Sequence, residues 1–208
     1  NNTLEFIGVP YHGSMPYNGV NAGLHMLNFL GHLYDIKRLR DIYDDYCDGK
    51  GFGFKGDYHD QHFDCTTYNV GKITFDGQHL VVFVNTRFPP MIDVDTVIKN
   101  VTLNTGSEVE LLGGSVGFIA DPKSTFIQTL LKSYQEETGD YKSKPLAIGG
   151  GTYSRESKNT VAFGAQFPTR DYKMHGDDEF FPINDFLANM QIYAHAVDAL
   201  SDYLRKGE

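Results

Sequence analysis

The clearest fold signal in this chain is the stretch GKITFDGQHLVVFVN, residues 71–85. Two runs of strand-forming residues, 71–75 and 79–85, flank the dipeptide Asp76-Gly77. Asp-Gly between such runs is a strong hairpin signal, because the tight turns that suit a twisted hairpin need residues that tolerate positive φ. The sequence therefore predicts an antiparallel β-hairpin in the first half of the chain.

Helical patterns surround this hairpin. Apolar residues recur every three or four positions over residues 18–34, which predicts an amphipathic helix with Asn18 as a possible N-cap. The same period predicts a second helix over residues 36–46 and a third that opens at Asp93. Short apolar runs predict two further strands, at residues 4–9 and 109–112. This order of elements indicates an α+β layer, with helices on one face of an antiparallel sheet.

The second half of the chain shows a different order of helical and strand-like patterns. A helix opens at Asp121-Pro122 and is stopped by Gly139, and a long helix over residues 186–204 closes the chain. Short apolar runs predict strands at residues 144–148 and 160–163. Together they indicate a second, α/β layer with parallel-type strands. The boundary falls near residues 113–117, so we expect one domain over residues 1–115 and another over 116–208.

Composition excludes several function classes. The 208 residues carry a formal charge of −9 and no basic tract, which argues against a nucleic-acid partner. No run approaches the roughly 18 apolar residues of a membrane helix. Two cysteines form neither a disulfide framework nor a zinc pair, which favours the cytoplasm. The chain opens on Asn1-Asn2-Thr3 rather than Met, which suggests a processed chain or a fragment.

Three regions carry candidate chemistry. His12 follows the first expected strand and precedes a Ser-Met-Pro turn, so it would present an imidazole to a cleft. Asn85 and Arg87 stand two apart at the end of a strand and so share a face, where an arginine could bind a carboxylate with two parallel hydrogen bonds. An arginine held in an edge salt bridge is the structural alternative.

The third region is the glycine triplet at residues 149–151. Glycines after an apolar strand let the backbone approach a ligand closely, although a tight turn explains them equally well. Tyr153 and Arg155 are alternate residues and could face the same cleft. His175 lies in a polar loop among carboxylates, where it is either a metal ligand or a solvated surface histidine. The His- and Asp-rich residues 58–65 read as an exposed edge or linker rather than a metal site.

Taken together, these regions resemble one family. They are similar to the second half of the bacterial Xaa-His dipeptidases (PepV-type, carnosinase-like), within the dinuclear zinc aminopeptidases, carboxypeptidases and deacylases. The resemblance spans nearly the whole chain and rests on these segments: His12-Gly13-Ser14-Met15-Pro16, Gly19-Val20-Asn21-Ala22-Gly23, residues 66–71, Asn85-Thr86-Arg87-Phe88-Pro89, Gly149-Gly150-Gly151-Thr152-Tyr153-Ser154-Arg155, Phe163-Gly164-Ala165 and His175 with Glu179.

The resemblance implies a lid domain, followed by the C-terminal part of a catalytic domain. In the lid, His12 would hold the substrate carbonyl as it becomes an oxyanion, and Arg87 with Asn85 would bind the free carboxylate of a dipeptide. Backbone groups of Gly150 and Gly151, with Arg155, would line the cleft. His175 would ligate one of two zinc ions.

The match is incomplete, because the family's other zinc ligands and its Glu general base lie upstream of the matched region. The only Glu-Glu pair here, Glu136-Glu137, falls in the last turn of an expected helix. We therefore expect a C-terminal fragment of a zinc-dependent dipeptidase, inactive alone without its N-terminal half. Two alternatives remain open: an N-acyl amino acid deacylase such as a desuccinylase, and a non-catalytic peptide-binding module.

Overall fold

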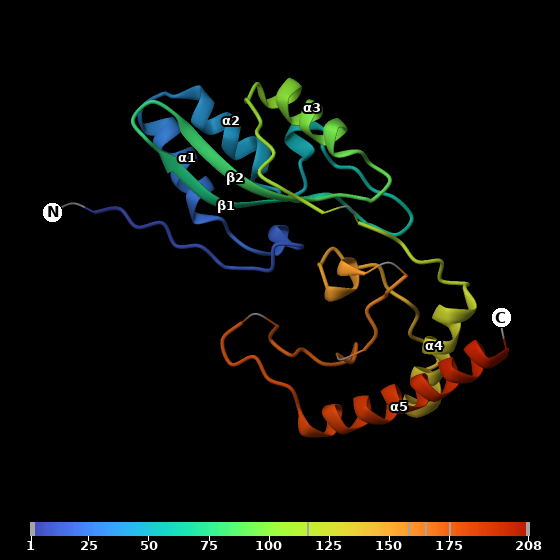
Figure 1. The fold of residues 1–208 in the computed structure, drawn as a ribbon. Coiled ribbons are helices and arrows are strands. Elements are labelled where there is room, and N and C mark those ends of the chain that lie inside the picture. The colour runs from blue at the N-terminus through green and yellow to red at the C-terminus, as the bar shows by residue number, and fades with distance from the viewer. Residues whose placement is uncertain (1–2, 116, 158, 165, 175, 207–208) are drawn as a thin grey trace. The chain divides into compact units, whose positions relative to one another are not determined.

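The structure is a computed structural model that describes residues 3–206 except 116, 158, 165 and 175. Within those ranges it is a mixed α+β fold, with five α-helices and one two-stranded antiparallel sheet (Figure 1). The chain divides into two compact units. The first is Asn1–Gly117 with Ile148–Gly150, and the second is Phe118–Ala147 with Gly151–Glu208. The segment 148–150 thus groups with the first unit, although the sequence had placed it in the second domain.

The hairpin expected at residues 71–85 is present, and it is longer than the sequence indicated. Strand β1 (Thr67–Phe75) pairs antiparallel with β2 (Leu80–Arg87). The Asp76 carboxylate holds the turn by accepting two backbone N–H groups, at 2.8 and 2.7 Å. A register shift between Val70 and Lys72 places one extra residue in β1, which is a β-bulge.

The core of the first unit lies on one face of this hairpin. It is formed with three helices: α1 (Ala22–Leu33), α2 (Lys37–Tyr46) and α3 (Val94–Thr105). Buried side chains of these helices and of the strands form one cluster, together with Phe54 of the 3-10 helix Phe52–Phe54: Leu24, Leu27, Ile42, Tyr46, Phe54, Tyr68, Val70, Val97 and Val101. Because strand side chains alternate between faces, the opposite face carries Thr67, Asn69, Asn85 and Arg87.

Asn21 joins the first helix to the sheet. Its side-chain oxygen caps α1 by accepting the N–H of Leu24 at 3.1 Å, and its amide nitrogen donates to the Val70 carbonyl at 2.7 Å. The helix therefore begins after Asn21, and the expected cap at Asn18 is wrong. Asn18 instead ends a short 3-10 helix, Pro16–Asn18.

The second unit contains α4 (Thr125–Thr138) and the 24-residue α5 (Ile183–Lys206), which pack side by side (Figure 1). Ser124 caps α4 and Gly139 ends it in the left-handed conformation, with φ of +72°. Buried apolar side chains from both helices include Ile127, Leu130, Ile192 and Ala196. No helix in the described part of the chain is both long and apolar enough to cross a bilayer.

Four expected strands do not form within the described residues: 4–9, 109–112, 144–148 and 160–163. Residues 4–9 contribute only an isolated bridge between Val9 and Val20. The side chains of Leu112 and Leu146 stay 72% and 81% exposed. A run of apolar residues indicates that a segment favours the extended conformation. A β-strand also needs a neighbouring strand with which to form hydrogen bonds, and these segments have none among the described residues. The expected parallel-type layer is therefore wrong for the part of the second unit that the structure describes.

Candidate functional site

His12 lies in a loop of the first unit that is closed at its base. Val9 and Val20 exchange two backbone hydrogen bonds of 2.9 Å each. The backbones approach so closely there that a Cβ on Gly8 would lie 2.5 Å from the Val20 carbonyl oxygen. Glycine is therefore required at that end of the loop. The His12 carbonyl also accepts the N–H of Met15 at 2.8 Å, so His12 opens a tight turn within the loop.

The His12 ring is oriented by a residue of the same turn. Its Nδ1 lies 2.6 Å from the Ser14 hydroxyl oxygen and accepts the backbone N–H of Ser14 at 3.3 Å. Both contacts meet the same ring nitrogen. Ser14 therefore helps to orient the half-buried imidazole.

Arg87 lies at the end of β2, with Asn85 beside it on the same face. The Arg87 Nε donates to the Asn85 side-chain oxygen at 3.2 Å, and one terminal nitrogen donates to the Gly149 carbonyl. Burial lowers the pKa of the Arg87 guanidinium from its ordinary value, yet an arginine remains charged at neutral pH. Among the described residues no carboxylate lies within salt-bridge distance of Arg87. The edge salt bridge is therefore absent from this part of the chain.

The turn and the strand face meet. A Cβ on Gly13 would lie 3.4 Å from the terminal Nη2 of Arg87 and 3.4 Å from the side-chain nitrogen of Asn69, which pairs with Asn85 across the hairpin. A Cβ on Gly149 would lie 3.3 Å from that of Ser14. The first unit thus brings the His12 turn, the Asn85–Arg87 pair and the 149 segment to one place.

The other predicted cleft residues are placed differently. Gly150 belongs to the first unit, and a Cβ there would make only ordinary contact with Ile148. Gly151 and Arg155 belong to the second unit. The Arg155 Nε pairs with Glu156 at 3.1 Å. Tyr153 and Arg155 both lie in the 3-10 helix Tyr153–Glu156, and the cleft that they were expected to share stays a prediction.

His175 lies outside the described residues, so its metal-binding role stays a prediction. Among the residues that are described, no group of three or more His, Cys, Asp or Glu side chains is placed to hold a metal ion. The His- and Asp-rich residues 58–65 form an irregular segment in which Asp60 accepts the backbone N–H groups of His62 and Phe63 at 2.7 and 2.9 Å.

A buried polar network in the second unit was missed by sequence reasoning. The Tyr172 hydroxyl donates to the Asp185 carboxylate at 2.7 Å and accepts the N–H of Phe167 at 2.9 Å. Arg170 pairs with the same carboxylate at 3.2 Å. Burial, then the hydrogen bond to Asp185, raises the pKa of Tyr172. The network fastens residues 167–172 to the first turn of α5. Tyr172 precedes His175 by three residues in the sequence.

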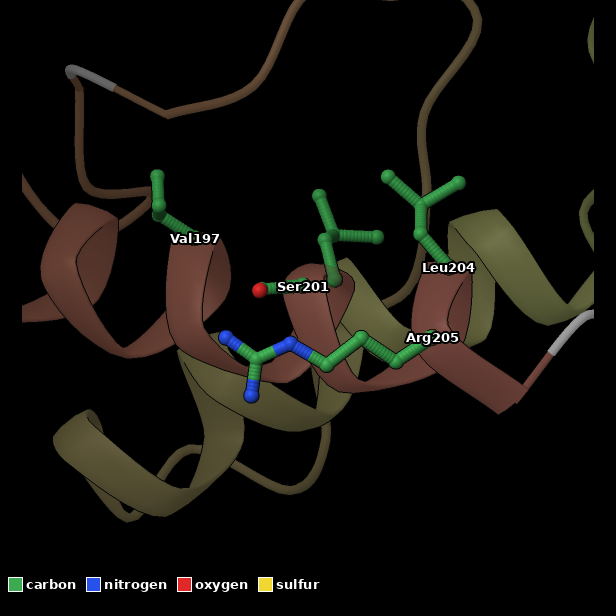
Figure 2. Close-up of a pocket in the computed structure, with 5 residues that line it drawn as sticks. Val197, Ser201, Leu204 and Arg205 are labelled. Atoms are coloured by element: carbon green, nitrogen blue, oxygen red, sulfur yellow. The ribbon is translucent and has the colours of Figure 1, made fainter.

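A separate hollow lies on α5 of the same unit. Figure 2 shows Val197, Ser201, Leu204 and Arg205 projecting around it, and Leu200 completes the lining. Apolar side chains dominate, and Arg205 pairs with Asp202 at 3.7 Å. The lining offers no nucleophile with an adjacent base, so it is no candidate for catalysis.

The site in the first unit is therefore a set of donors. It joins a guanidinium, an amide and an imidazole, which suit carboxylate and carbonyl oxygens. Two of its members, Ser14 and Asn69, were not singled out from the sequence. The sequence does carry a signal for each of them. Ser14 follows His12 by two residues, and Asn69 follows Thr67 by two residues, a spacing that places both side chains on the same face of a strand.

No protein-family model matches the chain. Among curated proteins, one named "Putative dipeptidase" from Staphylococcus haemolyticus is 33% identical over 207 residues, covering 95% of this chain and 44% of that protein. Proteins of the same name from Staphylococcus saprophyticus and Staphylococcus aureus are 32% and 31% identical, covering 93% and 95% of this chain. The chain spans less than half the length of these relatives, which it resembles over nearly its whole own length.

Proposed function

We propose that this chain provides the substrate-binding part of a dipeptidase, which hydrolyses the peptide bond of dipeptides with a free carboxylate. The names of its relatives support a peptide substrate. The observation that carries the proposal is Arg87. It is a half-buried cation without a carboxylate partner among the described residues, and it lies against the turn that begins at His12.

In this proposal Arg87 binds the substrate carboxylate. A guanidinium presents its N–H groups in a planar fork that matches the two oxygens of a carboxylate. Asn85 assists, because its side-chain oxygen accepts the Arg87 Nε and its NH2 group is left as the donor. The requirement for a free carboxylate would restrict the site to short peptides.

His12 would donate to the carbonyl oxygen of the scissile bond. A donor already in place when negative charge develops on that oxygen lowers the barrier, and removal of one such donor typically costs about 3 kcal/mol. The structure supports this role by holding the imidazole in a turn that contacts the Arg87 side. Gly150, Gly151 and Arg155 remain proposed cleft residues, with roles that follow from the resemblance.

The described residues do not fit a zinc centre, because no group of three potential ligands is assembled among them. The two zinc ions and the catalytic base are proposed to reside in segments of a longer enzyme that these 208 residues do not include, with His175 as the one ligand from this chain. The chain alone is then expected to be inactive.

The proposed partner is a short peptide rather than a nucleic acid, as the net charge of −9 indicates. The cytoplasmic location is proposed from the sequence alone, whose two cysteines form neither a disulfide framework nor a zinc pair. A deacylase of N-acyl amino acids would use the same arginine, but the names of the relatives favour dipeptides. Titration of the chain with dipeptides and with succinylated amino acids separates the two substrate classes.

Arg87→Ala tests the carboxylate assignment. Hydrogen bonds to charged groups contribute about 1.5–3 kcal/mol, so the dissociation constant of a dipeptide should rise about 10- to 100-fold. The dissociation constant of the same dipeptide with an amidated C-terminus should stay unchanged. Isothermal titration calorimetry measures both.

Arg205→Ala is the matched control, because it removes the same charge from the side chain of an arginine that is 77% exposed. Its dipeptide affinity should equal that of the wild type. If Arg87→Ala keeps the preference of the wild type for a free over an amidated C-terminus, Arg87 does not bind the carboxylate.

A further inference from the structure

The two contacts from Ser14 to His12 restrict where the imidazole proton lies. Both meet Nδ1: the Ser14 hydroxyl oxygen at 2.6 Å and the Ser14 backbone nitrogen at 3.3 Å. A backbone N–H can only donate. The ring nitrogen that faces it must therefore offer a lone pair when the imidazole is neutral.

The alternative tautomer conflicts with this geometry. A proton on Nδ1 would point toward the backbone N–H of Ser14, and two donors would face each other. With Nδ1 as the acceptor, the Ser14 hydroxyl is free to donate to it as well. The proton of the neutral ring then resides on Nε2, because the two ring nitrogens carry one proton between them.

We propose that Ser14 is a positioning residue that holds neutral His12 in the Nε2–H tautomer. Nε2 is then a hydrogen-bond donor and not a base. The turn maintains this state, because the Met15 N–H bond to the His12 carbonyl keeps Ser14 within reach of the ring. Ser14 itself needs no contact with a ligand. That Nε2 donates to a substrate carbonyl rests on the proposed dipeptidase function, whereas the tautomer rests on the turn alone.

The tautomer is read from the nitrogen resonances of the ring. We suggest NMR on the 208-residue chain with 15N-labelled histidine, at a pH where titration shows His12 to be neutral. His12→Gln identifies the signals. The expected result is a pyridine-type shift for Nδ1 and a pyrrole-type shift for Nε2. A pyrrole-type Nδ1 would overturn the proposal, and this measurement needs no variant of Ser14.

Ser14→Ala removes the hydroxyl and keeps the backbone N–H. Loss of one neutral hydrogen bond should shift the tautomer ratio about fivefold toward Nδ1–H. Ser201→Ala removes a hydroxyl from α5 in the second unit and should leave the His12 signals unchanged. Ring shifts that are identical in Ser14→Ala and wild type would refute the role of Ser14.

A final arm separates this inference from the proposed function. Addition of a dipeptide to the labelled wild-type chain should move the Nε2 resonance of His12. If the tautomer is as stated and the dipeptide moves no ring signal, the proposed substrate role of His12 fails, and the tautomer assignment stands.

Discussion

Replacement of Asn21 by alanine should lower the free energy of opening of the first unit by a predictable amount. The side chain makes two hydrogen bonds, one to the N–H of Leu24 and one to the carbonyl of Val70. Loss of an N-cap costs about 1 kcal/mol, and loss of the second bond costs about 1 kcal/mol more. The sum, about 2 kcal/mol, corresponds to about a 30-fold increase in the opening of the unit.

Amide hydrogen exchange is the suitable assay, because the chain has two units and no tryptophan to report on one of them. Exchange of core amides such as those of Leu27 and Val70 should accelerate about 30-fold in Asn21→Ala. Asn21→Ser keeps the cap but is too short to reach Val70, so about fivefold acceleration is expected. Equal exchange rates in Asn21→Ala and Asn21→Ser, or an acceleration of less than about twofold in Asn21→Ala, would contradict a stabilising role for the bond to Val70.

Two further predictions concern the second unit. Tyr172→Phe should destabilise it by about 2 kcal/mol, because the substitution removes the hydroxyl that donates to the Asp185 carboxylate in a buried site. Thermal unfolding measures the change, and Tyr153→Phe, at a residue that is 95% exposed, should be neutral. Asp140 should make the stability of the second unit sensitive to acid. Hydrogen bonds, above all the one from the Ser143 hydroxyl, lower the pKa of its carboxyl group from 3.8 to about 2. The stabilisation from the ionised carboxylate is complete above about pH 4 and is lost as pH falls through about 2. Asp140→Asn should therefore flatten the dependence of stability on pH between these values. An unchanged dependence in the variant would contradict this role of Asp140.

The sequence predicted those elements whose signals are local. The hairpin around Asp76-Gly77 and the helix capped by Asp93 both form, because turn and capping chemistry act within a few residues. The start of α1 was misplaced for the opposite reason. Asn21 is favoured over Asn18 by its bond to Val70, which is 49 residues away. No local pattern contains that information.

The candidate site shows the same division. His12, Asn85 and Arg87 were identified from residue type and spacing, and strand alternation gave the shared face of the last two. The contact of Arg87 with Gly149 joins residues 62 apart and could not be read from spacing. The bonds from Ser14 to His12 depend on the turn's backbone geometry, which a His-Gly-Ser run allows but does not dictate.

Because Val9 and Val20 close the base of the loop, the sequence of the His12 turn can be replaced without opening the loop. The reciprocal backbone bonds and the Asn21 anchor lie outside residues 10–18. Gly19 must be kept, because a Cβ there would lie 2.6 Å from the Val9 carbonyl oxygen. Doubling the length of such a loop costs only about 0.6 kcal/mol of closure entropy. New sequences grafted between Val9 and Gly19 could therefore present other groups to Arg87, while the bridge between the two valines stays closed.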